Sequence, residues 1–211
     1  MPPDLRMEKA LRKQGFKLIA GVDEVGVGPL AGPVLAAAII LPEKIKTKGI
    51  DDSKKLSPQK RSELFKSIID EAVSVGVGIV DRETIDQINI LRASHLALRL
   101  AVESLTIKPE YILVDGKYPI KIKTPQLQLC GGDRKCTSIA AASIVAKVLR
   151  DKIMDEYDKF FPQFGFCKNK GYGTKFHLDN LKQFGPCPIH RFSFLPVRNA
   201  FKLKLLRPLV G

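Results

Sequence analysis

The segment between Pro33 and Pro42 constrains the fold more than any other part of this chain. Eight consecutive apolar residues, 34–41, lie between the two prolines. Proline interrupts both helices and sheet ladders, so the run has the length of a β-strand and is shorter than a buried helix. It is also the longest continuous apolar run in the chain, and it is far too short to cross a bilayer. The segment therefore predicts a strand and no membrane span.

Four other short segments have the pattern of strands, because each is mostly apolar or alternates between polar and apolar residues. They are residues 17–23, 75–80, 111–115 and 126–130. Between them, Ser57 followed by Pro58 is typical of a helix start, since serine caps the first turn and proline is tolerated there.

Helices dominate the later part of the chain. Residues 93–105 are rich in alanine and leucine, and residues 138–160 form the longest predicted helix, which Pro162 ends. Thr174 can cap a further helix that ends at Gly185, and one more is expected near 197–205. Strands followed by helices predict an α/β fold, with a mixed sheet and a helical C-terminal extension.

The chain is strongly basic for its size. It has 211 residues, 45% of them hydrophobic, and a formal net charge of +13. A chain with enough apolar residues for a core and with this much positive charge favours a polyanionic partner. Nucleic acid is the first candidate and an anionic membrane surface the second. The four cysteines form no zinc pattern and are too few for a disulfide scaffold, so we expect reduced thiols. The N-terminus lacks a signal-peptide core, and a cytoplasmic protein is predicted.

Acidic residues stand where two predicted strands end. Asp23 and Glu24 follow an apolar strand, Asp115 ends another, and Asp133 follows two glycines before the longest helix. In α/β sheets, sites collect at strand ends, and clustered carboxylates repel one another unless a cation holds them. Hard cations such as Mg²⁺ prefer oxygen ligands, and two of them can act together on a phosphodiester. In so basic a chain, this pattern predicts a metal site for phosphodiester chemistry.

Structural explanations compete for each of these acids. Asp115 followed by Gly116 is typical of a hairpin turn, and Asp133 could cap the longest helix. Asp23 and Glu24 are successive strand residues, which face opposite sides of a sheet. Both can reach one site only if the strand bends locally, and the sequence leaves this open.

Residues 26–32 form a glycine-rich segment that matches the dinucleotide-binding fingerprint formally, at Gly26, Gly28 and Ala31. Asp51 lies about where the ribose-binding acid of that motif is expected. The fingerprint needs a helix directly after the glycines, whereas a proline and a strand follow here. We therefore expect the glycines to allow close approach of the backbone to a sugar–phosphate chain.

These motifs together resemble the type 2 ribonuclease H family, ribonuclease HII. The residues that carry the resemblance occur in the family's order over most of the chain: Gly21 to Val34, Asp52-Ser53-Lys54-Lys55-Leu56, Val114-Asp115-Gly116, Gly132-Asp133-Arg134-Lys135, Ser138 to Val148 with Arg150-Asp151, Lys170-Gly171-Tyr172-Gly173-Thr174, and His190 to Phe194.

The resemblance implies a five-stranded ribonuclease H sheet flanked by helices, in a catalytic domain of residues 1–160 with a helical extension of residues 161–211. It implies that Asp23, Glu24, Asp115 and Asp133 are catalytic and bind Mg²⁺ or Mn²⁺. The implied reaction is two-metal hydrolysis on the 5′ side of ribonucleotides, in RNA–DNA hybrids or embedded in duplex DNA, which leaves 3′-hydroxyl and 5′-phosphate ends. The implied role is removal of ribonucleotides and RNA primers from DNA, by a monomer with no membrane partner.

The resemblance also implies substrate contacts outside the carboxylates. Tyr172 is expected to lie against the sugar at an RNA–DNA junction, although a tyrosine after a glycine turn can also be structural. The full set of expected substrate-binding residues is Gly26, Val27, Gly28, Ser53, Lys54, Lys147, Arg150 and Tyr172. His177 and His190 are expected to be structural.

One position departs from the family pattern, which usually has arginine between the two glycines where this chain has Val27. The glycine amides can still contact a 2′-hydroxyl, but the grip on the adjacent phosphate and the preference for a single ribonucleotide are put in doubt. The alternatives are another ribonuclease H-like nuclease, such as ribonuclease HIII or a resolvase, or a nucleic-acid-binding protein without catalysis. A nucleotide-dependent oxidoreductase is a more distant alternative.

Overall fold

A computed structural model describes residues 2–206 of the chain. Contacts between residues divide it into two units. Unit 1 contains residues up to 25, residues 35–79 and residues 94–148, and unit 2 contains residues 26–34, residues 80–93 and the residues from 149 onward. The boundary that we expected at residue 160 stays a prediction, and the last five residues of the predicted extension lie outside the described residues.

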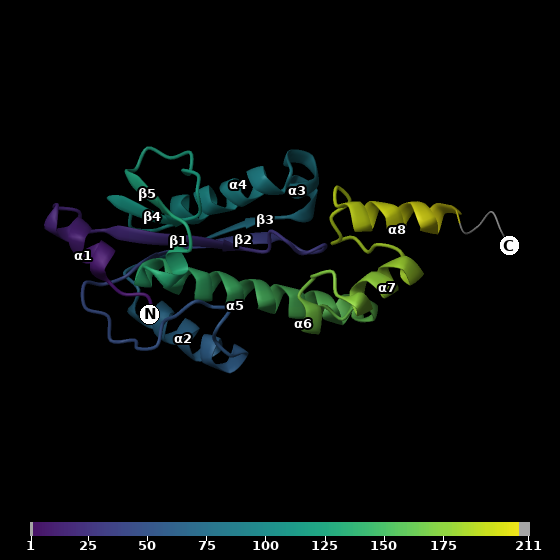
Figure 1. The fold of residues 1–211 in the computed structure, drawn as a ribbon, viewed down its shortest axis with the longest axis horizontal. Coiled ribbons are helices and arrows are strands. Elements are labelled where there is room, and N and C mark those ends of the chain that lie inside the picture. The colour runs from purple at the N-terminus through teal and green to yellow at the C-terminus, as the bar shows by residue number, and fades with distance from the viewer. Residues whose placement is uncertain (1, 207–211) are drawn as a thin grey trace. The chain divides into compact units, whose positions relative to one another are not determined.

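Unit 1 is built on one mixed five-stranded sheet, as predicted (Figure 1). Its strands are β1 (Ile19–Val25), β2 (Val34–Ile40), β3 (Ser74–Val80), β4 (Tyr111–Asp115) and β5 (Gln126–Leu129). They lie in the order β3-β2-β1-β4-β5. Strand β1 is antiparallel to β2 and parallel to β4, and β4 is parallel to β5. The carboxyl ends of β1 and β4 therefore meet at one edge of the sheet.

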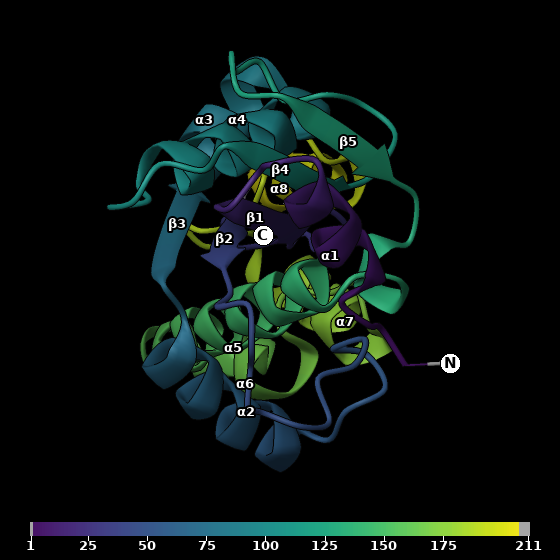
Figure 2. The same cartoon turned by 90° about the vertical axis from the view of Figure 1, so that its left-hand side faces the viewer.

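Helices cover both faces of the sheet, α4 (Ile90–Glu103) on one side and α2 (Pro58–Glu71) and α5 (Thr137–Phe160) on the other (Figures 1 and 2). Glycines let these helices approach closely. A Cβ on Gly78 would lie 2.1 Å from the carbonyl oxygen of Ala97 in α4, and a Cβ on Gly21 would lie 2.1 Å from the carbonyl carbon of Ser138 in α5. The sheet is therefore covered on both faces, which explains why β2 is fully apolar.

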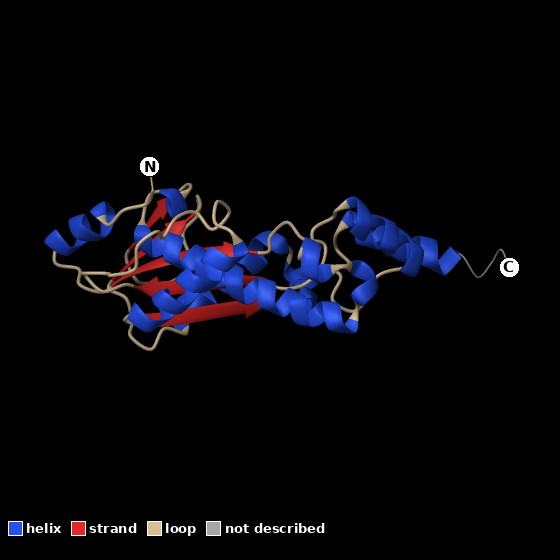
Figure 3. Ribbon diagram, turned by 90° about the horizontal axis from the view of Figure 1, so that it is seen from below, coloured by secondary structure: helices blue, strands red, loops and turns tan. Residues whose placement is uncertain are grey.

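Unit 2 is mainly helical (Figure 3). Beyond β5, the residues up to 206 form only helices, loops and an isolated bridge. Its helices are α3 (Arg82–Ile88), the second half of α5, η2 (Pro162–Phe164), α6 (Phe166–Asn169), α7 (Lys175–Phe184) and α8 (Leu195–Leu206). A separate core forms around Met154, Phe164, Phe166 and Leu181, all at most 1% exposed. The C-terminal part is helical, as expected.

Most predicted elements are present within one to three residues of their expected ends. Ser57 caps α2 by accepting a hydrogen bond from the N–H of Lys60, and Thr174 caps α7 by accepting one from the N–H of His177. The sequence did not predict helix α1 (Arg6–Lys13), α3 or the short turns η1 (Gly132–Arg134), η2 and α6. These are short elements, whose ends tertiary contacts determine more than local propensity does.

Among residues 2–206, none of the helices combines the length and the apolar character that a bilayer crossing requires.

Candidate active site

Two carboxylates stand side by side near the end of β1, on opposite faces of the sheet. The Asp23 carboxylate accepts a hydrogen bond from Ser143, on α5, and the Glu24 carboxylate accepts one from Ser94, on α4. The backbone N–H of Glu24 also donates to Oδ1 of Asp23, at 2.8 Å. The alternation expected for a strand is therefore present, and each carboxylate is supported by the helix on its own side. The charge of Asp115, at the end of the neighbouring parallel strand, still acts on both, so the two carboxylates belong to the same end of the sheet although they leave β1 on opposite faces.

Asp115 brings Asp133 to the same edge of the sheet. Asp115 is the last residue of β4, the parallel neighbour of β1. Its Oδ1 accepts a hydrogen bond of 2.7 Å from the N–H of Gly132, which holds the η1 turn and Asp133 against the end of β4. Since β4 and β5 are parallel, Asp115 is not part of a hairpin turn. Asp133 lies within η1, before α5 begins, and only 4% of it is exposed.

The charges of these carboxylates act on one another. Burial raises the pKa of Asp23 well above its usual range, and the charges of Glu24 and Asp115 raise it further. Burial and the charge of Asp115 raise the pKa of Glu24 to about 7. Burial and the charges of Asp115 and Asp52 raise the pKa of Asp133. A positive charge placed among these groups would relieve the repulsion and lower all three pKa values.

These groups fit a hard divalent cation in chemistry, because every donor is a carboxylate oxygen. Among residues 2–206, no three acidic, imidazole or thiol groups already surround one point as ligands of a common ion. Negative charges repel one another, so these carboxylates are separated in the metal-free protein. Binding of a cation would have to bring them closer to each other.

We expect the metal-free protein to become less stable as the pH rises from about 4.5 to about 7. The folded protein holds the Glu24 proton more tightly than the unfolded chain does, because its pKa is about 7 instead of the ordinary 4.5. Unfolding then releases a proton in this window, so higher pH favours unfolding, by about 1–3 kcal/mol. Urea denaturation in chelator from pH 5 to pH 8 measures the change.

Glu24→Gln is the matched control, since it removes the titrating group and should flatten this part of the profile. Stability that rises through this window in the wild-type protein would contradict the assigned direction of the Glu24 shift.

Polar residues of the 52–54 segment surround the carboxylates in unit 1. Ser53 and Ser143 are hydrogen-bonded through their hydroxyl groups, at 2.9 Å, and Ser143 in turn bonds Asp23. The charge of Lys54 acts on both Glu24 and Asp133 and lowers their pKa values. Two of the predicted contact residues, Ser53 and Lys54, are thus next to the carboxylates, and Lys147 lies in the half of α5 that belongs to unit 1.

In unit 2, a buried arginine organises the glycine-rich segment, which we call the glycine loop (residues 26–33). Arg191 is fully buried. Its guanidinium donates hydrogen bonds of 2.6–3.1 Å to the carbonyl oxygens of Gly26, Val27, Pro29 and Gly32. Burial lowers its pKa to about 9, and the charge of Arg150 adds to this. One side chain therefore fixes the path of the whole loop.

Arg150 supports the same loop from α5. It is fully buried, and its guanidinium donates to the carbonyl oxygens of Pro33, Ala31 and Lys170, at 2.9–3.1 Å. All three of its donor nitrogens are thus used inside unit 2. Arg150, which the family resemblance placed among the substrate contacts, is positioned here to link the loop to the Lys170–Tyr172 segment.

The loop conformation depends on Gly26 more than on Gly28. Gly26 has φ +93°, and an added Cβ would lie 2.3 Å from Nε of Arg150. Gly28 has no positive φ, and a Cβ there would meet Tyr172 at an ordinary 3.5 Å. Val27 also has no positive φ, and 38% of this residue is exposed to solvent. The Gly28 backbone and the Tyr172 ring are therefore neighbours within unit 2.

Two buried histidines hold the backbone of Tyr172. His177 Nδ1 is 2.8 Å from the Tyr172 carbonyl oxygen, which can only accept, so this nitrogen carries a proton. His177 Nε2 then accepts from Nε2–H of His190, at 2.9 Å, and His190 Nδ1 accepts from the backbone N–H of Cys187, at 3.0 Å. Burial lowers the pKa of both imidazoles, that of His190 to about 3. Both rings are neutral, and they are structural, as expected.

Sequence reasoning missed the supporting residues Ser94, Ser143 and Arg191. Arg191 lies in a segment that resembles the family's pattern, but a surface cation is the usual state of an arginine. Nothing in the local sequence distinguishes one that is buried under a distant loop.

Comparisons with known proteins cover most of the chain. The family model described as Ribonuclease HII matches residues 20–197. A ribonuclease HII of Listeria innocua is 53% identical over 195 residues, which cover 92% of this chain and 74% of that protein. The crystal structure of ribonuclease H2 from Pyrococcus horikoshii has a TM-score of 0.74 at 29% identity and covers 88% of this chain and 97% of that one.

A more distant structure, Bst ribonuclease HIII in complex with Mn²⁺, has a TM-score of 0.75 at 18% identity and covers 92% of this chain and 72% of that one. This likeness concerns the fold alone.

Proposed function

Because the chain belongs to the ribonuclease HII family and is thus an endoribonuclease of the ribonuclease H type, we propose that it cuts the phosphodiester on the 5′ side of ribonucleotides. The substrates are RNA–DNA hybrids and duplex DNA with embedded ribonucleotides, and the role is removal of ribonucleotides and RNA primers. The observation that carries the proposal is the set of four carboxylates at the ends of β1 and β4 and in the η1 turn, where the charge of Asp115 acts on the other three.

Ribonuclease H enzymes depend on divalent metal ions, and we propose Mg²⁺ or Mn²⁺ for this one. Asp23, Glu24, Asp115 and Asp133 would hold the ions. When bound, two such ions supply the positive charge that favours attack of water on phosphorus and departure of the 3′ oxygen. Hydrolysis then breaks the P–O3′ bond and leaves a 3′-hydroxyl and a 5′-phosphate.

The protein's own groups prepare this arrangement. Ser143 and Ser94 fix the Asp23 and Glu24 carboxylates by hydrogen bonds. The Gly132 N–H does the same for Asp115, so these three carboxylates are oriented before substrate arrives. Ser53, Lys54 and Lys147 are proposed to contact phosphates in unit 1, where a lysine near the carboxylates also limits their repulsion.

In unit 2, we assign two contacts with the sugar that distinguishes RNA from DNA. The backbone of Gly26, Val27 and Gly28 is proposed to contact the 2′-hydroxyl, because Arg191 holds this segment in one conformation. The Tyr172 ring is proposed to lie against the sugar, since 45% of that residue is exposed. Arg150 positions both segments through its bonds to Pro33 and Lys170.

The test is incubation with duplex DNA that contains one ribonucleotide and with an RNA–DNA hybrid, each with Mg²⁺, with Mn²⁺ and with chelator. We expect metal-dependent cleavage 5′ of the ribonucleotide, with 3′-hydroxyl and 5′-phosphate ends by end-group analysis. Cleavage of the hybrid but not of the single-ribonucleotide duplex would instead favour a ribonuclease HIII-like specificity. Binding without any cleavage would favour a non-catalytic nucleic-acid-binding protein.

Tyr172→Ala should reduce cleavage at a single embedded ribonucleotide by about ten- to a hundredfold. Contact between an aromatic ring and a nucleotide contributes about 1–3 kcal/mol on the scale for stacking with single strands. Tyr172→Phe keeps the ring and serves as the matched control, with near-normal cleavage. Steady-state rates on the single-ribonucleotide duplex and on a plain hybrid measure the effect, and equal losses on both substrates would support a purely structural tyrosine.

A further inference from the structure

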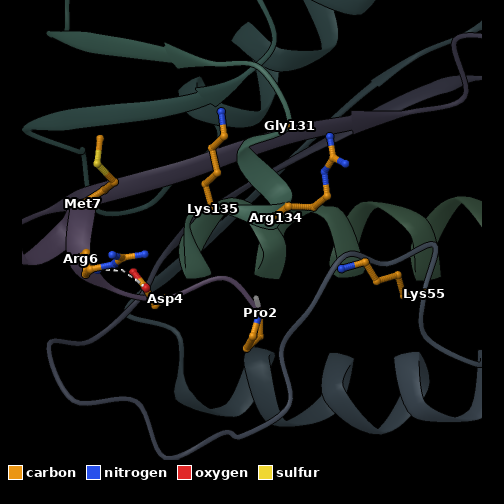
Figure 4. A pocket seen from close by; sticks show the side chains of 8 residues that line it. All are labelled: Pro2, Asp4, Arg6, Met7, Lys55, Gly131, Arg134 and Lys135. Atoms are coloured by element: carbon orange, nitrogen blue, oxygen red, sulfur yellow. Dashed lines mark hydrogen bonds and ion pairs between the residues drawn. The ribbon is translucent and has the colours of Figure 1, made fainter.

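A second group of charged side chains lies in unit 1 outside the carboxylate site, around a hollow of ≈ 690 Å³ (Figure 4). Four of its lining residues are cationic and one is acidic. We call this the cationic hollow, and it is lined by Pro2, Asp4, Arg6, Met7, Lys55, Gly131, Arg134 and Lys135. Of these eight described residues, only Pro2 and Met7 have apolar side chains, and none has an aromatic ring that could stack with a base.

The walls of the hollow are fixed to each other. The N–H of Thr137, the first residue of α5, donates to the carbonyl oxygen of Asp4, at 3.1 Å. Glu8 of α1 is 1% exposed and accepts hydrogen bonds from the N–H and the hydroxyl of Ser138, at 3.0 and 2.7 Å. The segment that carries Asp4 and Arg6 is therefore attached to the segment that carries Lys135.

The cations of the hollow are available to a polyanion. Arg6 pairs with Asp4, but 79% of the Arg6 side chain is exposed. Lys55 pairs with Asp51 and is 50% exposed. Lys135 donates to the carbonyl oxygen of Cys130, at 2.8 Å. Exposed ion pairs are weak and are screened by salt, so a phosphate can replace these partners at little cost.

The hollow lies directly beside the carboxylate site. Arg134 is the last residue of the η1 turn that contains Asp133, and Gly131 and Lys135 directly precede and follow this turn. A nucleic-acid strand held at Asp133 must continue past this turn, and its next phosphates need positive charge more than apolar surface.

We propose that the cationic hollow binds phosphodiester groups of the substrate at some distance from the bond that is cut. This inference rests on the proposed function, because the ligand is the nucleic-acid substrate of that function. The hollow extends the enzyme's grip along the duplex by contacts that carry no sequence information.

The test compares Arg6→Gln/Lys135→Gln with the wild-type protein in chelator, where the substrate is bound but not cut. Both side chains line the hollow without contacting a carboxylate of the active site. Binding of a long duplex with one ribonucleotide should weaken about tenfold, and the slope of log affinity against log salt should fall by about 0.9 for each phosphate that the variant no longer binds. A short duplex that ends close to the ribonucleotide on both sides should be affected much less.

Lys121→Gln/Lys123→Gln is the matched control. It removes the same charge from two exposed side chains that precede β5, outside the hollow. Equal weakening in the two double variants, or unchanged binding in Arg6→Gln/Lys135→Gln, would overturn the proposal. So would weaker binding of AMP or inorganic phosphate by Arg6→Gln/Lys135→Gln with duplex binding unchanged, because the hollow would then serve a free phosphate ligand. Cleavage by the wild-type protein with Mg²⁺ tests the proposed function separately.

Discussion

Asp115→Asn is expected to reduce Mg²⁺-dependent cleavage by at least about a thousandfold, the scale of losing a group that stabilises charge in the transition state. Asp115 is the carboxylate whose charge raises the pKa of Asp23, Glu24 and Asp133, so it lies at the centre of the set. Asparagine keeps its shape and an oxygen acceptor for the N–H of Gly132. Single-turnover cleavage of a duplex with one ribonucleotide measures the effect.

The fold should survive this change. Removing one of several repelling charges should leave the free energy of unfolding in chelator unchanged or raise it, and it should lower the pKa of Glu24. Asp70→Asn, an exposed position on α2, is the control and should cleave normally. Wild-type turnover by Asp115→Asn would refute the metal assignment. Loss of both folding and cleavage would show a structural role.

Arg191→Met should lower the free energy of unfolding by about 3–5 kcal/mol, because it leaves buried polar groups without their partner. The Arg191 guanidinium is the shared donor for four carbonyl groups of the glycine loop. Methionine fills a similar volume, so the decrease reports the hydrogen bonds more than a cavity. Urea denaturation at pH 7 measures it.

Arg198→Met on the exposed face of α8 is the matched control and should change stability by less than about 0.5 kcal/mol. Arg191→Lys tests the geometry of the group. Lysine keeps a positive charge but lacks the planar fork, so it cannot satisfy the same carbonyl groups. We expect Arg191→Lys to fold, to bind plain DNA duplex normally and to discriminate poorly between ribonucleotide and deoxyribonucleotide. Wild-type stability of Arg191→Met would contradict the role of Arg191 in holding the loop.

The sequence by itself determined the strands and the acids at their ends. The apolar run between Pro33 and Pro42 became β2, and the segment that ends at Asp115 became β4 with the predicted bounds. Short-range chemistry decides these features, since proline ends regular structure and capping residues act within one turn. The motif order also identified the family, which the comparisons confirmed.

Other features depended on contacts between residues far apart in the sequence. The parallel pairing of β4 with β5 excluded the hairpin at Asp115, although Asp-Gly is typical of one. Asp23 and Glu24 do face opposite sides of the sheet, and only the packing of α5 and α4 supplies Ser143 and Ser94 to support them.

The two buried arginines are the clearest case of a feature that the local sequence does not predict. Arg150 and Arg191 are cations in the sequence, and composition predicts that they are solvated or bind phosphate. In the folded chain they satisfy the carbonyl groups of a loop more than a hundred residues earlier. A loop with no ladder of its own needs partners for its backbone, and only the tertiary structure decides which side chains provide them.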